Sequence, residues 1–381
     1  MSTNYSRSSC PNLTGITSSP LLSCTLLKTS DKNNEDLLKT PHGTVTVAKE
    51  GNPRGTAIIT LHDLGLNHCS NFQVKLDLIQ FVLYLLFQSF FNCSAMHSIL
   101  TKFCIYHITA PGQQPGATDI PAQSSYPNMD QLSEVVECVC QHYSVSHCVG
   151  LGVGMGANVL VRLASRRQKL IDGLIVINCN SQTSGWMEWA YHKVNMKAIK
   201  KGRRLPDSVV DYLVWHHLGS IGKEKGSGHV CPAAMYRQYF QTEVNPANLA
   251  HLLQSYVNRS DLNITRDKSS SEKIKPGAPA TLQVPVLNIV GDRSPHVEAT
   301  VTLNSRLDPA KCTWMKIRDA GMVLEEQKEK VAEAIGLFLQ GLGYTLRMGR
   351  SRSAVETRNR LSLQLQGNQV LGSLAMGLFG S

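Results

Sequence analysis

One stretch of this 381-residue chain, VSHCVGLGVGMGANVLVRLASR at residues 145–166, constrains the fold more than any other. An apolar run leads into glycines at positions 150, 152, 154 and 156, and apolar residues at helical spacing follow at Val159, Leu160 and Leu163. This change of period predicts a buried strand, a tight turn and an amphipathic helix. Strand-turn-helix units of this kind are typical of α/β proteins with a parallel sheet.

Further apolar runs alternate with helical patterns along the chain. The predicted strands cover residues 43–51, 55–63, 103–112, 147–154, 172–180, 284–292 and 311–321. Helical patterns at 129–143 and 157–170 lie between some of them, which predicts a mostly parallel sheet with helices on both faces and right-handed crossovers. The first two strands are joined by a turn at Asn52 to Gly55, so we expect them to pair as a hairpin.

Residues 184–270 break this alternation. They contain four helical patterns, SGWMEWAYHKVNMKAI, PDSVVDYLVWHHLG, AAMYRQYFQTEV and NPANLAHLLQSYVNR, and no clear strand pattern. Because they are inserted between two sheet strands, we expect a helical cap over the carboxyl edge of the sheet, where α/β proteins place their sites. Trp186, Trp189 and Trp215 would then form cap core or line an apolar pocket.

The predicted organisation has five parts. A flexible polar leader (1–35) precedes the first part of an α/β core (36–183), the helical cap (184–270), the second part of the core (271–345) and a flexible basic tail (346–381). The most apolar segment, 78–91, is shorter than the roughly 20 residues that span a bilayer, which favours a buried or surface helix. The dipeptide Phe-Gln occurs at 72–73 and 87–88, so residues 74–88 are interpreted as an insertion.

Composition and charge limit the location and the partners. The formal charge of +10 gathers at 193–204 and 347–360, which suits protein partners or an anionic membrane surface. These clusters lack interleaved aromatic residues and nucleic-acid motifs, so no nucleic-acid partner is expected. The eleven cysteines show no metal spacing and the N-terminus has no signal-peptide pattern, which predicts a cytoplasmic protein without a metal or cofactor.

Two site types use a glycine-rich turn between a strand and a helix. A dinucleotide site would use Gly152, Gly154 and Ala157 as G-x-G-x-x-A and would place pyrophosphate at the helix N-terminus. That reading needs an acidic residue after the next strand, where the chain has Asn178 and Cys179, and no strand should precede the turn. It is therefore the weaker interpretation.

The second type is the nucleophile elbow, G-x-S-x-G, of the α/β-hydrolase fold. Its nucleophile position holds Gly154, and the motif IRDAGM places Met322 where the base histidine of an A-G-H triplet would stand. The strand at 284–292 places Asp292 at the acid position, where a loop or helix cap is the simpler role. His62 or His296 could replace the base but not the nucleophile, so the Ser-His relay has no members.

The oxyanion region is also unusual. His62 and Asp63 occupy the place of the usual His-Gly motif, and Asp63 adds a negative charge where hydrogen-bond donors are needed.

Taken together, these residues resemble the N-myc downstream-regulated (NDRG) family, α/β-hydrolase-fold proteins regarded as non-catalytic. The most specific matching stretches include TLHDLGLNHCSNFQ (60–73), GLGVGMGANVLVRLA (150–164), GWMEWA (185–190) and NSRLDP (304–309), and the similarity covers about residues 36–345.

The resemblance implies a non-enzymatic cytoplasmic adaptor or signalling protein in growth, differentiation or stress responses. It also implies a phosphorylated tail, with Ser351 and Ser353 as the expected sites. The alternatives are a small-ligand or lipid receptor, or a residual hydrolase, using a pocket between cap and sheet, and peripheral attachment to a membrane.

Overall fold

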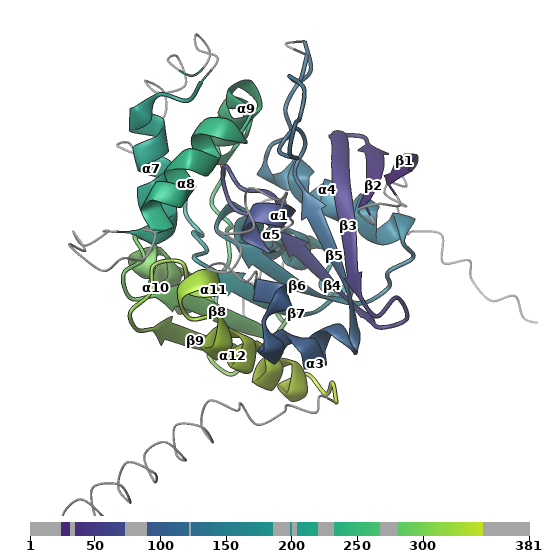
Figure 1. The fold of residues 1–381 in the computed structure, drawn as a ribbon. Coiled ribbons are helices and arrows are strands. Elements are labelled where there is room, and N and C mark those ends of the chain that lie inside the picture. Colours follow the sequence, from purple (N-terminus) through teal and green to yellow (C-terminus); the bar gives the residue numbers. More distant parts are fainter. Residues whose placement is uncertain are drawn as a thin grey trace, which may run out of the picture.

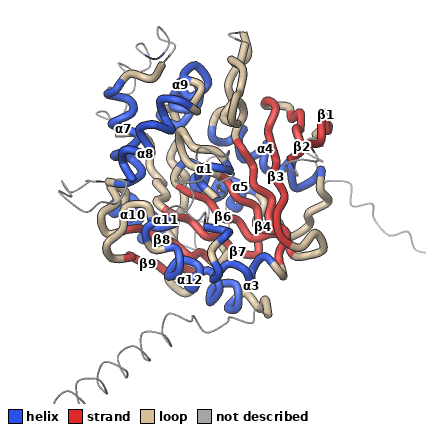
Figure 2. The backbone as a smooth tube through the Cα atoms, in the orientation of Figure 1, coloured by secondary structure: helices blue, strands red, loops and turns tan. Residues whose placement is uncertain are grey.

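The protein is built on one nine-stranded sheet that separates two layers of helices (Figures 1 and 2). In this computed structural model, residues 24–30, 35–72, 90–121, 123–185, 199, 204–219, 232–266 and 281–345 are described. The strands are β1 (Thr25–Ser30), β2 (Glu35–Thr40), β3 (Gly43–Gly51), β4 (Thr56–Leu61), β5 (Phe103–Thr109), β6 (Cys148–Val153), β7 (Ile171–Ile177), β8 (Val286–Gly291) and β9 (Cys312–Ile317).

The strand order is β1-β2-β3-β5-β4-β6-β7-β8-β9. Strands β1, β2, β3 and β5 pair antiparallel, and every pairing from β5 through β4 and β6 to β9 is parallel. The predicted mostly parallel sheet, covered by helices, is therefore confirmed.

The expected hairpin of the first two predicted strands is wrong, because β5 lies between β3 and β4. Val47 of β3 pairs with Ile108 of β5, and Ile58 of β4 pairs with Ile105 from the other side. Five of the six β4 residues are buried, so this strand needs neighbours on both edges. The connection after β3 instead turns over the start of β5, where Asn52 donates its N–H to the Phe103 carbonyl at 2.9 Å.

The predicted leader also ends earlier than residue 35. Residues 25–30 form β1, which pairs with β2 from Thr25 opposite Lys39 to Ser30 opposite Glu35. The apolar side chains of β1 are solvated, with Leu26 46% and Leu27 52% exposed. Backbone pairing therefore holds this edge strand, and no hydrophobic alternation marks it in the sequence.

Adjacent residues of a strand contribute to opposite apolar layers. Ile59 of β4 belongs to the layer that contains α4 (Met129–His142) and α5 (Met155–Arg166). Ile58 belongs to the layer that contains α3 (His97–Leu100) and α12 (Lys328–Gly341). This period of two is the side-chain alternation of a strand, and it places core on both faces of the sheet.

The cap helices are α7 (Asp207–Leu218), α8 (Pro232–Thr242) and α9 (Pro246–Val257), and they group at one end of the molecule (Figure 1). The remaining described helices are α1 (His68–Asn71), η1 (Phe90–Asn92), η2 (Ser94–Met96), α10 (Val297–Arg306) and α11 (Val323–Glu326). Trp215 of α7 is 47% exposed, which contradicts its predicted place in the cap core or pocket.

Several predictions fall outside the described residues: Trp186, Trp189, the insertion at 74–88 and most of the apolar segment 78–91. None of the helices in the described part of the chain combines the length and the apolar character that crossing a bilayer requires.

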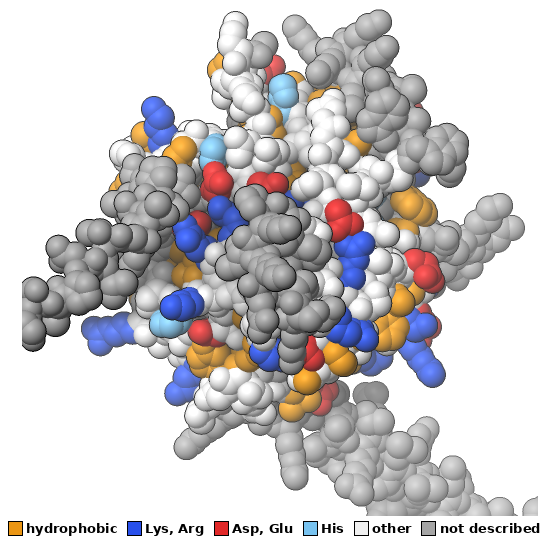
Figure 3. Space-filling view, turned by 180° about the vertical axis from the view of Figure 1, so that it is seen from behind, with side chains coloured by type: hydrophobic (Ala, Val, Ile, Leu, Met, Phe, Trp, Pro, Cys, Tyr) orange, Lys and Arg blue, Asp and Glu red, His pale blue; other side chains and the backbone are white. Residues whose placement is uncertain are grey.

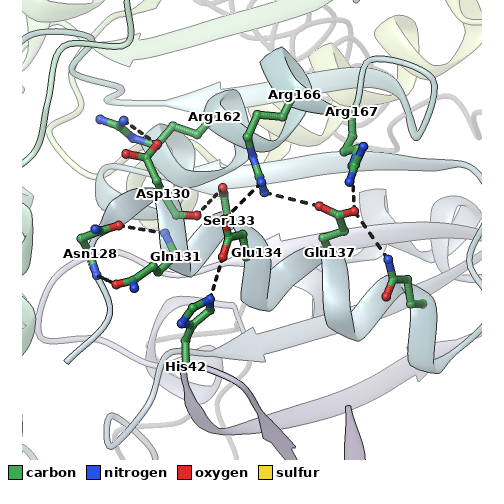
Figure 4. A network of polar contacts seen from close by, with 11 residues as sticks. His42, Asn128, Asp130, Gln131, Ser133, Glu134, Glu137, Arg162, Arg166 and Arg167 are labelled. Atoms are coloured by element: carbon green, nitrogen blue, oxygen red, sulfur yellow. Dashed lines mark hydrogen bonds and ion pairs between the residues drawn. The ribbon is translucent and has the colours of Figure 1, made fainter. Parts of the chain in front are cut away.

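A polar network fastens α4 to α5 (Figure 4), and one of its arginines also binds the end of the cap. Arg162 of α5 is 6% exposed and donates to Asp130 Oδ1 of α4 at 2.9 Å. The same guanidinium donates to Asn158 Oδ1 at 2.9 Å and to Ser260 Oγ at 2.8 Å. Because Ser260 follows α9, one buried cation joins the core to the end of the cap.

We expect Arg162→Ala to lower the free energy of unfolding by about 2–4 kcal/mol, since it removes several charge-assisted hydrogen bonds. Arg166→Ala is the matched control on the same helix. Arg166 is partly exposed and contacts Glu134 and Glu137 at 3.4 Å, so its loss should cost less than about 1 kcal/mol. Urea unfolding of the two variants compares them, and equal losses would contradict the role given to Arg162.

Candidate functional site

The glycine-rich turn between β6 and α5 is a tight elbow centred on Gly154. Gly154 has φ 50° and ψ −109°, a backbone conformation that side chains rarely adopt. The neighbouring backbone leaves no room for larger residues beside it. A Cβ at Gly152 would lie 2.5 Å from the Ala157 nitrogen, and a Cβ at Gly156 would lie 2.1 Å from the Leu61 carbonyl oxygen.

The Asp63 carboxylate, just beyond the end of β4, fills the space in front of this elbow. Its Oδ1 accepts the backbone N–H of Leu64 at 2.8 Å and the backbone N–H of Met155 at 2.9 Å. In acyl-transfer enzymes of this fold, the N–H that follows the nucleophile and an N–H from the loop of a neighbouring strand stabilise the oxyanion. A carboxylate oxygen of the chain itself occupies the equivalent pair of donors here.

The same carboxylate occupies the space that a side chain at position 154 would need. A Cβ built on Gly154 would lie 2.2 Å from the Asp63 Cγ and from both carboxylate oxygens. Glycine at 154 and aspartate at 63 are therefore sterically dependent on each other.

Two histidines from the last turn of α7 complete the surroundings of Asp63. His216 Nε2 lies 3.0 Å from Asp63 Oδ2, and His217 Nδ1 lies 3.6 Å from the same oxygen. All three residues are at most 2% exposed. The sequence placed these histidines in a cap helix but did not assign them to the site. The signal that could have found them is a pair of adjacent ionisable residues within the apolar pattern VVDYLVWHHL.

The electrostatics of this cluster favour an ionised Asp63. Burial alone raises the pKa of the Asp63 carboxyl, but the charge and hydrogen bond of His216 and the Met155 N–H hold the pKa well below its ordinary value. Burial lowers the pKa of His217 to about 4. At neutral pH the pocket therefore holds a carboxylate beside a neutral His217 ring.

His62, which the sequence places in the oxyanion region, forms hydrogen bonds to backbone groups through both ring nitrogens. Its Nδ1 donates to the Asp63 carbonyl at 2.8 Å, and its Nε2 accepts the Ala110 N–H at 3.0 Å. Burial lowers the pKa of the ring to about 4. Both nitrogens of His62 are therefore occupied in joining the loop after β4 to the end of β5.

Asp292 and Met322 stand at the predicted acid and base positions of a hydrolase triad. Both lie in loops that pack against the end of α7. Asp292 is exposed, and its Oδ1 accepts the Ala320 N–H at 3.3 Å, which is the geometry of a loop cap. Met322 is 1% exposed and immediately precedes α11, and it donates its N–H to Glu326 Oε2 at 2.9 Å.

The contact with α7 is close at both loops. A Cβ at Gly321 would lie 2.0 Å from the Leu218 carbonyl oxygen, and His296 Nε2 lies 3.0 Å from the His216 carbonyl oxygen. The last turn of the cap helix therefore lies against both loops.

The geometry argues against the dinucleotide interpretation. The Met155 N–H at the start of α5, which would face a pyrophosphate, already binds Asp63. The position for a ribose-binding acid holds Asn178, whose side-chain oxygen accepts from Ser294 Oγ at 3.2 Å. Five strands, β1 to β5, also precede β6 and its turn in the chain, whereas a dinucleotide fingerprint follows the first strand of its domain.

Among the described residues, two groups of side chains come close enough to share a metal ion, although the sequence spacing predicted none. They are Asp63 with His216 and His217, and Glu35 with His68 and Cys69. Each joins residues that are far apart in the chain, which explains why spacing alone missed them.

The strand order, the elbow and the inserted cap together define an α/β-hydrolase fold. Among solved structures, an esterase from Thermogutta terrifontis superposes with a TM-score of 0.59 at 16% identity, over 81% of this chain and 98% of that one. A hydrolase from Pseudomonas aeruginosa PA01 gives a TM-score of 0.58 at 14% identity, over 80% of this chain and 98% of that one. At these identities the similarity shows the fold alone.

The family follows from closer relatives. The sequence profile of the Ndr family matches residues 35–346. Protein NDRG1-A of Xenopus laevis is 37% identical over 310 residues, which cover 81% of this chain and 70% of that protein. Protein NDRG2 of Mus musculus is 34% identical over 332 residues, which cover 85% of this chain and 80% of that protein. The chain belongs to the Ndr family, as the sequence motifs indicated.

The steric dependence between positions 154 and 63 can be measured directly. We expect Gly154→Ala to lower the free energy of unfolding by at least about 3 kcal/mol, from backbone strain and overpacking together. In an Asp63→Ala background the cost of the same change should fall by about 1–3 kcal/mol.

Gly116→Ala is the matched control, because Gly116 also has a positive φ of 66° but no atom within 4 Å of an added Cβ. Chemical unfolding of the single and double variants gives the coupling energy. Additive effects at positions 154 and 63 would contradict the contact.

The depressed pKa of Asp63 predicts a pH dependence. Its ordinary value is 3.8, so its stabilising contribution is fully present above about pH 4 and is lost as the pH falls further toward the lower folded value. Asp63→Asn should therefore cost about 1.5–3 kcal/mol at pH 7. The difference in the free energy of unfolding between wild type and Asp63→Asn should become smaller as the pH falls below about 4. Urea unfolding across this range measures it, and a constant difference would contradict the assignment.

Proposed function

We propose that this chain is a non-enzymatic, cytoplasmic adaptor or signalling protein built on an α/β-hydrolase scaffold. One observation carries the proposal: the Asp63 carboxylate accepts the Leu64 and Met155 N–H groups that a catalytic site would direct at a developing oxyanion. A negative oxygen already bound to those donors opposes the formation of a second one.

The other parts of an acyl-transfer site support the same conclusion. Gly154 offers no nucleophile and Met322 offers no base. His62 uses both ring nitrogens on the backbone. His216 is bound to Asp63, and a Ser or Cys nucleophile does not stand at the elbow.

The family suggests a role in growth, differentiation or stress responses through protein partners. The basic tail would carry the regulation, with Ser351 and Ser353 as phosphorylation sites that lie outside the described residues. Phosphate at either serine would add negative charge to a basic segment and so change its partners.

The basic clusters at 193–204 and 347–360 would supply peripheral attachment to an anionic membrane. On the face shown in Figure 3, Lys and Arg side chains lie interspersed with Asp and Glu, which favours protein contacts over nucleic acid.

The alternative is a small-ligand or lipid receptor, or a residual hydrolase, with its pocket between cap and sheet. Beside the elbow, Asp63, His216 and His217 are packed against one another, so a small organic ligand would have to bind elsewhere along the cap. The predicted lining residues Trp186 and Trp189 lie outside the described residues.

Hydrolysis of activated short and medium acyl esters tests the proposal. We expect the wild type to match the buffer rate. We expect Gly154→Ser combined with Met322→His to remain silent as well, because Asp63 still occupies the donors and the space in front of position 154. Adding Asp63→Gly to that pair removes both obstacles, so any gained turnover should appear only in the triple variant.

Turnover that accompanies the purified wild type and disappears in Asp63→Asn or His216→Gln would overturn the proposal. It would show that the Asp63 and His216 pair is itself the catalytic machinery.

A further inference from the structure

We propose that Asp63, His216 and His217 form a binding site for a divalent transition-metal ion of the Zn²⁺ type, which fastens the cap to the sheet. The three candidate ligand atoms are Asp63 Oδ2, His216 Nε2 and His217 Nδ1. The two nitrogens lie 3.0 and 3.6 Å from the carboxylate oxygen, and all three atoms lie within 4.8 Å of one another.

The strongest observation is the state of His217 Nδ1. This atom is buried and has no hydrogen-bond partner among the described residues. The other ring nitrogen, Nε2, lies 2.9 Å from the Leu64 carbonyl oxygen and must donate its proton there. A proton on Nδ1 would be donated to the Asp63 carboxylate, but the distance from Nδ1 to Oδ2 is 3.6 Å, which is too long for a hydrogen bond. Nδ1 therefore carries a lone pair that faces a carboxylate, an arrangement that a cation between the two would stabilise.

The surroundings of the ligands have the form that metal sites use. Ligating histidines usually donate their second ring N–H to a carbonyl or carboxylate, which fixes the tautomer and the ring direction. His217 does this through the Leu64 carbonyl. Asp63 Oδ1 is held by the Leu64 and Met155 N–H groups, which leaves Oδ2 directed at the histidines. The backbone around Leu64 thus orients two of the three ligands.

The donor set selects the class of ion. Two imidazoles and one carboxylate suit Zn²⁺ and its first-row neighbours, whereas Mg²⁺ and Ca²⁺ prefer oxygen ligands alone. On binding, the proton on His216 Nε2 would be displaced, to solvent where Nδ1 already carries a proton and to Nδ1 where it does not. His216 would then ligate as a neutral imidazole, and both nitrogens and Oδ2 would present lone pairs.

The second group, Glu35 with His68 and Cys69, is a weaker candidate. His68 Nε2 already lies 3.2 Å from Cys69 Sγ and 3.5 Å from Glu35 Oε1, and its Nδ1 bonds Thr109 Oγ1 at 2.8 Å. Neither ring nitrogen of His68 is left over for an ion. This cluster includes the Cys69 thiol, so a Co²⁺ ion bound there would show a sulfur-to-metal charge-transfer band that an ion at Asp63, His216 and His217 would lack.

A metal at Asp63 would have a structural role. The ligands come from the loop after β4 and from the last turn of α7, so the ion would join the carboxyl edge of the sheet to the cap. This inference does not depend on the absence of catalysis, and either proposal can fail without the other.

The test uses the full chain, purified without a histidine tag, stripped with a chelator and titrated with Zn²⁺ in a calorimeter. We expect one tight site per chain. His217→Gln keeps an amide that can donate to the Leu64 carbonyl but removes Nδ1, and it should weaken binding by at least about 100-fold, more than an outer-shell change costs. His68→Gln, the control at the second group, should leave the affinity unchanged.

Co²⁺ gives a second readout that distinguishes the ligand sets. At Asp63, His216 and His217 it should show visible d–d bands without a sulfur-to-metal charge-transfer band, and His216→Gln should remove them. Circular dichroism confirms that each variant is folded. Absence of a one-to-one Zn²⁺ site, equal affinity in His217→Gln, or a sulfur charge-transfer band that His68→Gln removes would overturn the proposal.

Discussion

The hydrogen bonds of the Asp63 carboxylate are the interactions on which the rest of the site depends. One oxygen binds the N–H of Leu64 and the N–H that opens α5, and the other faces His216 and His217 of the cap. Three segments distant in sequence thus meet at one buried charge. A buried carboxylate is costly unless its oxygens are satisfied, so the ends of β4, β6 and α7 must all be in place together.

This arrangement also explains the residue choices at the elbow. A sharp turn from β6 into α5 needs glycine at 152 and 156, because neighbouring backbone atoms lie so close that a Cβ at either position would clash with them. At 154 the limit is the Asp63 side chain itself. The elbow position therefore carries no side chain, and the carboxylate of the neighbouring loop fills the space in front of it and binds two backbone N–H groups.

The sequence was informative where a periodic pattern or a specific motif exists. Buried strands such as β6 and β8, amphipathic helices such as α4 and α5, and the family motifs around 60–73 and 150–164 predicted the fold and its class. It was misleading for β1, whose side chains are solvated, and for the pairing of β3 with β4, because strand order depends on long-range contacts that no local pattern encodes. His216 and His217 were missed for a related reason. They lie 153 and 154 residues from Asp63, and only folding the cap onto the sheet brings them together.

The central claim is that an ionised Asp63 carboxylate occupies the donors at the elbow. Following the Asp63 carboxyl ¹³C resonance of the folded full chain against pH tests it most directly, with the Leu64 and Met155 amide resonances observed alongside. The account predicts a carboxyl that stays ionised well below its ordinary pKa of 3.8, with both amide protons held in strong hydrogen bonds throughout. A carboxyl that titrates at or above that value, with amides that exchange freely, would show that the donors are open and would contradict the account.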